Sequence, residues 1–181
     1  SHRGGVGKTT ISLNLGYGLA ESGNKVLLID FDPQASLSKS FGFDDTQTKY
    51  DSIANLYFDD VNIADIIHST YQDNLSIIPA SLDLNAVESE LLIDPFTVQV
   101  LHKHLMTIKN DYDYIFIDCA PMIGLLSKTA LFAADEIYIP VLCRGTYVLR
   151  DLEHVAIAIN VFNSYGEKQR HISGIILNEC S

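Results

Sequence analysis

A glycine-rich segment followed by a lysine and two threonines is the part of this sequence best suited to chemistry. Residues 3–10 read Arg-Gly-Gly-Val-Gly-Lys-Thr-Thr. Small residues let a backbone fold tightly around phosphate oxygens with several N–H groups pointing inward, and a helix that begins at Gly7 adds its positive N-terminal end. Lys8 is placed to reach terminal phosphates, and the Thr9 hydroxyl is placed to hold Mg²⁺. The segment therefore predicts a phosphate-binding loop, although His2 stands where the general pattern G-x-x-x-x-G-K-[ST] has its first glycine.

Aspartates follow two apolar segments that are typical of strands. Asp30 and Asp32 come at the end of residues 25–30, and Asp118 closes residues 114–118. Ligands of open α/β sheets bind at the carboxyl ends of the strands. An apolar strand that ends in Asp supplies a carboxylate that supports Mg²⁺, often through a bound water. Each acid alone is also typical of a turn after a strand. Together with the phosphate-binding loop, they predict a magnesium–nucleotide site.

Short apolar segments alternate with amphipathic ones along the whole chain. This alternation predicts an α/β fold with a doubly wound, mostly parallel sheet and helices on both faces. The expected strands are 25–30, 74–79, 114–118, 136–141 and 172–177. The expected helices are 8–22, 62–69, 84–92, 96–110, 125–134 and 148–163. No linker divides the chain, so residues 1–181 are expected to form a single domain.

The first expected helix has an apolar face and two internal glycines. Ile11, Leu15 and Leu19 recur at helical spacing. Gly16 and Gly18 weaken a helix intrinsically, so we expect them to allow close packing against the sheet. The chain begins inside the phosphate-binding loop, where a strand would already have delivered it. We therefore expect a fragment that lacks its first strand, with further sequence beyond residue 181.

Duplex DNA is bound mainly through Lys and Arg, which neutralise its phosphates. With a net charge of −11, the chain as a whole is therefore expected to bind DNA poorly. A local basic patch, or sequence beyond this chain, would be needed.

No apolar run approaches the ~20 residues that span a bilayer. Three cysteines match no metal-binding spacing and are expected to be free thiols in a reducing compartment: Cys119, Cys143 and Cys180. Cys119 follows Asp118, which leaves oxidation sensitivity open. His102 and His104 do not share a helix face and are not predicted metal ligands.

The motifs resemble those of the ParA/MinD family of P-loop ATPases. Residues 3–10 are similar to its deviant Walker A loop, (Lys or Arg)-Gly-Gly-x-Gly-Lys-Thr-Thr, and residues 30–34 to its Asp-x-Asp-Pro-Gln element, called Walker A′. Residues 111–121 and 174–178 also resemble family segments, so the similarity covers almost the whole chain. Ala120 and residues 143–147 depart from the family pattern.

The resemblance implies a P-loop NTPase fold with ATP and Mg²⁺ as cofactors. It gives Asp30 a place in the outer metal shell and makes Asp32 the residue that orients or activates the attacking water. It implies that Arg3 crosses a dimer interface to the partner's nucleotide, and that Asn178 reads adenine. The implied nucleotide contacts are Gly4, Gly5, Val6, Gly7, Lys8, Thr9, Thr10 and Asn178. The implied metal site is Thr9, Asp30 and Asp118, and the catalytic residues are Lys8, Asp32 and Arg3.

The function implied by the resemblance is that of a ParA-type ATPase in plasmid or chromosome partitioning. Such an ATPase forms an ATP-dependent homodimer, binds non-specific DNA on the nucleoid in the cytoplasm, and hydrolyses ATP slowly until a ParB-like partner stimulates it. Two alternatives remain open: a MinD-like ATPase that attaches to a membrane through a C-terminal amphipathic helix, and a nucleotide-dependent scaffold with negligible hydrolysis. The three strand-end acids argue against the scaffold. No cysteine pair lies at a spacing that suits an iron–sulfur relative.

Overall fold

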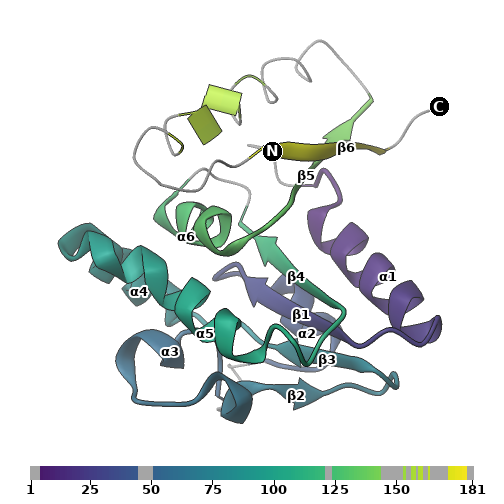
Figure 1. Cartoon of the computed structure of the whole chain (residues 1–181), viewed down its shortest axis with the longest axis horizontal. Helices are drawn as coiled ribbons and strands as arrows, with labels where there is room; N and C mark the ends of the chain where they lie inside the picture. Colours follow the sequence, from purple (N-terminus) through teal and green to yellow (C-terminus); the bar gives the residue numbers. More distant parts are fainter. Residues whose placement is uncertain are drawn as a thin grey trace.

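The structure is a computed structural model of the 181-residue chain. It describes residues 5–44, 51–120, 124–143, 153, 156–157, 159–160, 163 and 171–178. Arg3 and Gly4, which the sequence assigns to the site, lie outside these residues. Within them, helices surround a mostly parallel sheet, as the alternating sequence pattern predicts (Figure 1).

The strands form two sheets. The first has the order β2-β3-β1-β4 and consists of β1 (Val26–Phe31), β2 (His68–Ser69), β3 (Leu75–Ile78) and β4 (Tyr114–Cys119). β1 pairs in parallel with β3 and β4, and β2 pairs antiparallel to β3. The second sheet pairs β5 (Ile137–Leu142) with β6 (Ile172–Asn178) in parallel. The expected single sheet is thus divided, because no strand of the described part of the chain joins β4 to β5.

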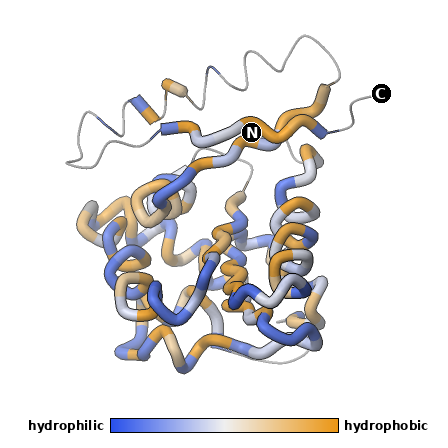
Figure 2. The backbone as a smooth tube through the Cα atoms, turned by 45° about the vertical axis from the view of Figure 1, so that its right-hand side comes forward, coloured by the Kyte–Doolittle hydropathy of each residue, from blue (hydrophilic) through white to orange (hydrophobic). Residues whose placement is uncertain are grey.

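The helices divide the core into layers on either side of β1. The longer helices are α1 (Lys8–Glu21), α4 (Leu84–Ile93), α5 (Val100–Ile108) and α6 (Leu125–Ala133). The shorter ones are α2 (Ser36–Ser40), α3 (Asn55–Phe58) and the 3₁₀ helices η1 (Ile63–Ile66) and η2 (Pro95–Gln99). Helix α1 covers one face of the sheet, and α4 and α5 lie on the other (Figures 1 and 2). Leu28 packs with Ala20 of α1, whereas Leu27 and Ile29 pack with residues of α4, α5 and α6. This alternation explains why all six residues of β1 are buried.

Two secondary-structure predictions need correction, and two short helices are additional. The segment predicted as helix 62–69 is η1 followed by β2, because its last residues pair with the edge of β3. The predicted helix 96–110 is divided into η2 and α5. The short helices α2 and α3 were not predicted. The predicted helix 148–163 lies largely outside the described residues, but Ile159 is buried against β5. None of the helices in the described ranges is long and apolar enough to cross a membrane.

The face of α1 that meets the sheet differs in part from the predicted one, because Leu19 packs against the core and Leu15 does not. Leu15 is 46% exposed, and the buried residues of this helix are Gly16 and Ala20. A Cβ atom on Gly16 would lie 2.7 Å from Cδ2 of the fully buried Leu28. A Cβ atom on Gly18 would meet no atom within 4 Å. Close packing therefore explains Gly16, as predicted, but does not explain Gly18.

These two glycines give a matched pair of substitutions in one helix. Gly18→Ala should raise the free energy of unfolding by about 0.5–1 kcal/mol, because alanine favours the helix and meets no neighbour. Gly16→Ala should lower it by about 1 kcal/mol, because Leu28 must move in a packed core. Urea unfolding followed by circular dichroism measures both values. An equal gain in stability for the two variants would contradict the close approach of α1 to β1.

Candidate nucleotide-binding site

The described part of the phosphate-binding loop has the backbone that its glycines allow. Gly5 and Gly7 have φ values of 85° and 91°, in the left-handed region that glycine adopts without steric cost. Gly7 is the N-cap of α1, and its carbonyl accepts the first helical hydrogen bond from the Ile11 N–H at 2.8 Å. Glycine has no side chain with which to cap the helix, so the N–H groups of the first turn suit an anionic ligand.

Lys8 and Thr9 lie beside acids of the strand ends. The side chains of Thr9 and Ser12 hydrogen-bond to Asp118, and the Lys8 ammonium attracts both Asp118 and Asp32. Burial lowers the pKa of Lys8, and the two acids oppose that shift. Burial also raises the pKa of Asp118, while Thr9 and Lys8 oppose the rise. The structure thus places one cation, two carboxylates and two hydroxyls at the start of α1.

Asp30 is fully buried and is held by neighbouring donors. Its Oδ2 accepts hydrogen bonds from the Ser38 N–H at 2.8 Å and the Ser38 hydroxyl at 2.7 Å, and its Oδ1 accepts one from the Asp32 N–H at 3.2 Å. The Ser38 oxygen in turn accepts the Ala80 N–H at 2.8 Å. Burial raises the pKa of Asp30 to about 6, against the effect of the Ser38 hydrogen bonds. A carboxylate has about four acceptor positions, so Oδ1 keeps capacity for a water bound to a metal. This arrangement suits the predicted outer-shell role.

Asp32 begins a tight turn that orients its carboxylate. Its Oδ1 accepts the Gln34 N–H at 2.9 Å, and its carbonyl accepts the Ala35 N–H at 2.8 Å. Ala35 closes the turn at φ 52°, an unusual value for a residue with a side chain. Local strain of this kind is found at functional sites. The turn directs one half-buried carboxylate toward the Lys8 side of the site.

Asn178 reaches the phosphate-binding loop from the end of β6. Its Nδ2 donates to the Val6 carbonyl at 3.1 Å, and a Cβ atom on Gly7 would lie 2.5 Å from that nitrogen. The predicted contact residue is therefore at the loop. Thr10, another predicted contact, is exposed in the first turn of α1.

The side chains present fit a magnesium ion that is shared with phosphate oxygens. Mg²⁺ is commonly held by one or two carboxylates together with substrate phosphates and water. Thr9 and Asp118 supply a hydroxyl and a carboxylate that already touch, and Asp30 lies beside Asp118 across the β1–β4 pairing. In the described residues, no group of three or more His, Cys, Asp or Glu side chains could hold a metal by itself. The expected ligand set is therefore one that a phosphate chain would complete.

Two serines of the site were missed by sequence reasoning. Ser12 lies one helical turn beyond Lys8 and Thr9, so its spacing was a usable signal. Ser38 lies in a short helix that follows the turn at Ala35, and nothing local indicates that its hydroxyl bridges Asp30 and Ala80.

The cysteine predictions hold in part. Cys119 is a free thiol, and burial raises its pKa to about 12, with Asp118 adding to the shift. A thiol with so high a pKa carries little thiolate at neutral pH, so oxidation sensitivity gains no support. Cys143 is disulfide-bonded, which contradicts the predicted free thiol. Cys180 lies outside the described residues.

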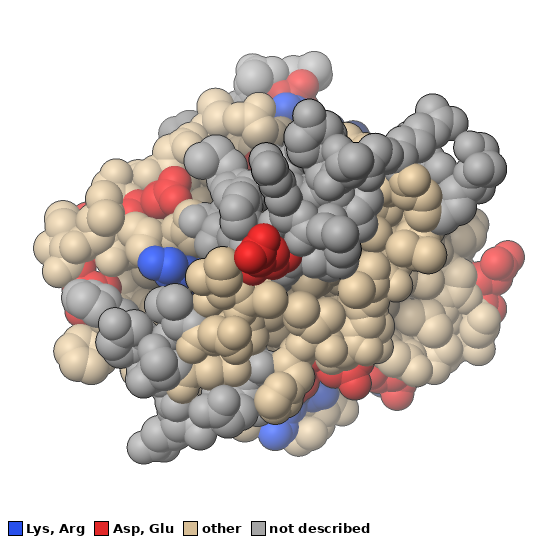
Figure 3. All heavy atoms as spheres, turned by 90° about the horizontal axis from the view of Figure 1, so that it is seen from above, with Lys and Arg blue, Asp and Glu red and all other residues tan. Residues whose placement is uncertain are grey.

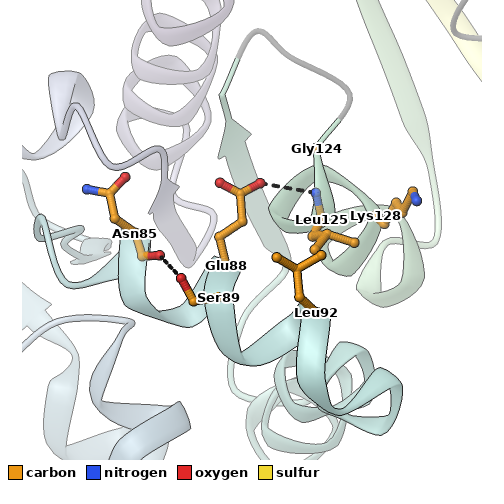
Figure 4. Close-up of a pocket in the computed structure, with 7 residues that line it drawn as sticks. All are labelled: Asn85, Glu88, Ser89, Leu92, Gly124, Leu125 and Lys128. Carbon is orange, nitrogen blue, oxygen red and sulfur yellow. Dashed lines mark hydrogen bonds between the residues drawn. The ribbon is translucent and has the colours of Figure 1, made fainter.

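A surface hollow of about 420 Å³ lies between α4 and α6 (Figure 4). It is lined by Asn85, Glu88, Ser89, Leu92, Gly124, Leu125 and Lys128. Glu88 Oε1 accepts the Leu125 N–H at 3.3 Å and so caps the start of α6. None of the predicted site residues lines this hollow, so it is not the predicted nucleotide site.

The chain is similar to known proteins along most of its length. A model of the AAA domain family (AAA_31) matches residues 1–172. The chain is 37% identical over 177 residues to the sporulation initiation inhibitor protein Soj of Bacillus subtilis, covering 98% of this chain and 69% of that protein. It is 38% identical over 172 residues to the chromosome-partitioning ATPase Soj of Treponema pallidum, covering 92% of this chain and 66% of that protein.

Solved structures show the same fold with nucleotide bound. Cobyrinic acid a,c-diamide synthase from Mycobacterium smegmatis, with ADP and magnesium, has a TM-score of 0.89 at 29% identity, covering 98% of this chain and 71% of that one. A putative plasmid partition protein from Borrelia burgdorferi bound to AMPPNP has a TM-score of 0.80 at 29% identity, with the same coverage.

The fold and the site together define a P-loop ATPase of the doubly wound class. Within that class, the chain belongs to the AAA domain family and to its ParA-type members, as the resemblance predicted. It spans 55–69% of the length of the first curated relatives, so the activities of whole relatives are not assigned to it by similarity.

The Ser38 hydroxyl gives a direct test of how Asp30 is held. Ser38→Ala should lower the free energy of unfolding by about 2 kcal/mol, because the buried Ala80 N–H loses its acceptor and Asp30 loses a donor. Ser40→Ala is the control: its exposed hydroxyl donates to the Ser36 carbonyl at 3.1 Å, and its removal should change stability by less than about 0.5 kcal/mol. Chemical denaturation measures both. Equal stability of the two variants would show that the Asp30–Ser38–Ala80 chain is not formed.

Proposed function

We propose that this chain is the nucleotide-binding part of a ParA-type partition ATPase that binds and hydrolyses Mg·ATP. The observation that carries the proposal is the meeting of Lys8, Thr9, Asp32 and Asp118 at the glycine-rich start of α1. The Soj relatives and the nucleotide-bound partition structure support it. The synthase reaction named for the Mycobacterium smegmatis protein is not transferred, because sequence relatives from Treponema pallidum and Myxococcus xanthus are described as chromosome-partitioning proteins.

The side chains have separate tasks in this proposal. The N–H groups of the loop and the Lys8 ammonium bind the phosphate chain and neutralise its charge. Thr9, Asp118 and Asp30 would hold Mg²⁺, and the ion would supply further positive charge at the phosphates. Asp32 holds the attacking water in line with the terminal phosphate and accepts its proton. Positioning and charge neutralisation supply most of the rate in phosphoryl transfer.

The wider assembly follows from the family resemblance. ATP would close two copies into a homodimer in which each Arg3 reaches the nucleotide of the other copy. The dimer would bind non-specific DNA on the nucleoid in the cytoplasm, and a ParB-like partner would stimulate hydrolysis. On the face shown in Figure 3, the described lysines stand apart rather than in a patch. With a net charge of −11, DNA binding is therefore assigned to the assembled full-length protein.

Two other functions make different demands on the full-length protein. A MinD-like ATPase needs a basic and apolar helix that binds lipid vesicles, whereas a partition ATPase needs ATP-dependent DNA binding that weakens with salt. A nucleotide-dependent scaffold needs no residue to orient water, and the turn that orients Asp32 argues against it. No contact in the described residues favours either alternative.

Two substitutions separate binding from hydrolysis. Lys8→Ala should weaken ATP binding by about 10- to 100-fold, because a charge-assisted contact to phosphate is lost. Asp32→Ala should keep ATP affinity within a few-fold and slow hydrolysis by about 100-fold or more. Fluorescent-nucleotide titration and phosphate release measure the two effects, with Lys103→Ala, an exposed lysine on α5, as the control.

Two results would contradict the assignments. Unchanged ATP affinity in Lys8→Ala would remove the phosphate-loop assignment. Normal turnover in Asp32→Ala, with the stimulating partner present, would remove the catalytic role of Asp32.

A further inference from the structure

One hydrogen bond joins the phosphate-binding loop to the second sheet. Asn178, the last residue of β6, donates from Nδ2 to the Val6 carbonyl at 3.1 Å across 172 positions of sequence. The acceptor belongs to the peptide group whose N–H is that of Gly7. This peptide lies in the part of the loop where N–H groups are expected to bind phosphate.

Because the peptide is trans and planar, the contact to the Val6 oxygen also fixes the direction of the Gly7 N–H. The C=O and N–H of a trans peptide point in opposite directions because the group is planar. The described chain contains no cis peptide bond. A donor that holds the Val6 oxygen therefore keeps the Gly7 N–H pointing away from Asn178.

The peptide needs such a restraint because its neighbours allow it to rotate. A flip of this group changes ψ of Val6 and φ of Gly7. Glycine populates positive and negative φ about equally, so Gly7, now at 91°, offers little steric resistance. Gly5, at φ 85°, gives the preceding backbone the same freedom.

Asn178 is itself held firmly enough to act as the restraint. Its backbone pairs with Leu142 in the β5–β6 register, and its carbonyl accepts the Cys143 N–H at 2.9 Å. Its amide packs so closely on the loop that a Cβ atom on Gly7 would lie 2.5 Å from Nδ2. The second sheet thus holds one peptide of the loop through one side chain.

We propose that Asn178 is a positioning residue that keeps the Val6–Gly7 peptide in its phosphate-binding orientation. Its Nδ2 contacts the loop, so we expect it to contribute to affinity for the phosphate chain of any ligand. The family resemblance instead assigns Asn178 to adenine. The two roles differ in what they predict for a ligand that has phosphates and no base. The inference rests on the proposed function, because it concerns the same ATP site.

The test compares ATP with inorganic tripolyphosphate, both with Mg²⁺, by titration calorimetry on the full chain. Asn178→Leu keeps a similar volume but cannot donate, and Asn178→Ala removes the donor without crowding Gly7. Both variants should lose affinity for ATP and for tripolyphosphate by the same factor, about 3- to 10-fold, as expected for one hydrogen bond. Asn85→Leu is the matched control. Asn85 lies on α4, and its Nδ2 also donates to a backbone carbonyl, that of Leu82, at 2.9 Å.

The outcomes separate the possible failures. Weaker binding of ATP with unchanged binding of tripolyphosphate would overturn the inference and support adenine recognition. Unchanged binding of both ligands would overturn it as well. A wild-type chain that binds neither ligand would contradict the proposed function itself. Thermal unfolding of each variant shows whether a loss of binding reflects a loss of fold, and an equal loss for both ligands at an unchanged midpoint supports the inference.

Discussion

The parallel pairing of β1 with β4 is the constraint on which the site depends. Its register places Asp30 directly opposite Asp118, at the ends of two strands that reach the edge of the sheet together. Side chains alternate along a strand, so a shift of one residue would turn one carboxylate to the other face. The register is strongly specified because β1 is buried along its whole length, with Leu28 on one face and Leu27 and Ile29 on the other.

This pairing brings together two buried acids, which is unfavourable without neighbours that compensate. Burial raises the pKa of Asp30 to about 6 and also raises the pKa of Asp118. The negative charge of Asp118 adds to the rise in the pKa of Asp30. Ser38 and Thr9 donate to the carboxylates, and the Lys8 ammonium attracts Asp118. A divalent cation beside these groups would favour their charged forms further. The same arrangement that costs stability in the free chain therefore suits a bound metal ion.

The elements that the sequence predicted well are those with a strong local signal. The apolar strands that end near Asp30 and Asp118 are six residues each. The phosphate-binding loop combines small residues with a lysine and a threonine, a combination that few ordinary turns contain. The strands β1, β3, β4, β5 and β6 were therefore placed to within one or two residues. The helix predicted over 62–69 failed because its final residues gain hydrogen bonds from the edge of β3, a contact that a local pattern does not contain.

The missed features of the site depend on contacts between distant or strained parts of the chain. The bridge from Asp30 through Ser38 to Ala80 requires the left-handed turn at Ala35, which has no glycine to signal it. The contact between Asn178 and Val6 joins the two ends of the described chain. The helical periodicity predicts Leu15 on the buried face of α1. In the structure the helix approaches the sheet closely at Gly16, so its buried residues are Gly16 and Ala20 and Leu15 is exposed.

We infer that the start of α1 and the ends of β1 and β4 form one site for ATP and Mg²⁺. The most direct measurement is a calorimetric titration of ATP into the full chain, once with excess Mg²⁺ and once with a chelator. The account predicts clearly tighter binding with Mg²⁺, because Thr9, Asp118 and the phosphate oxygens share the ion. Equal binding under both conditions, or no binding by the folded chain with Mg²⁺ present, would contradict it.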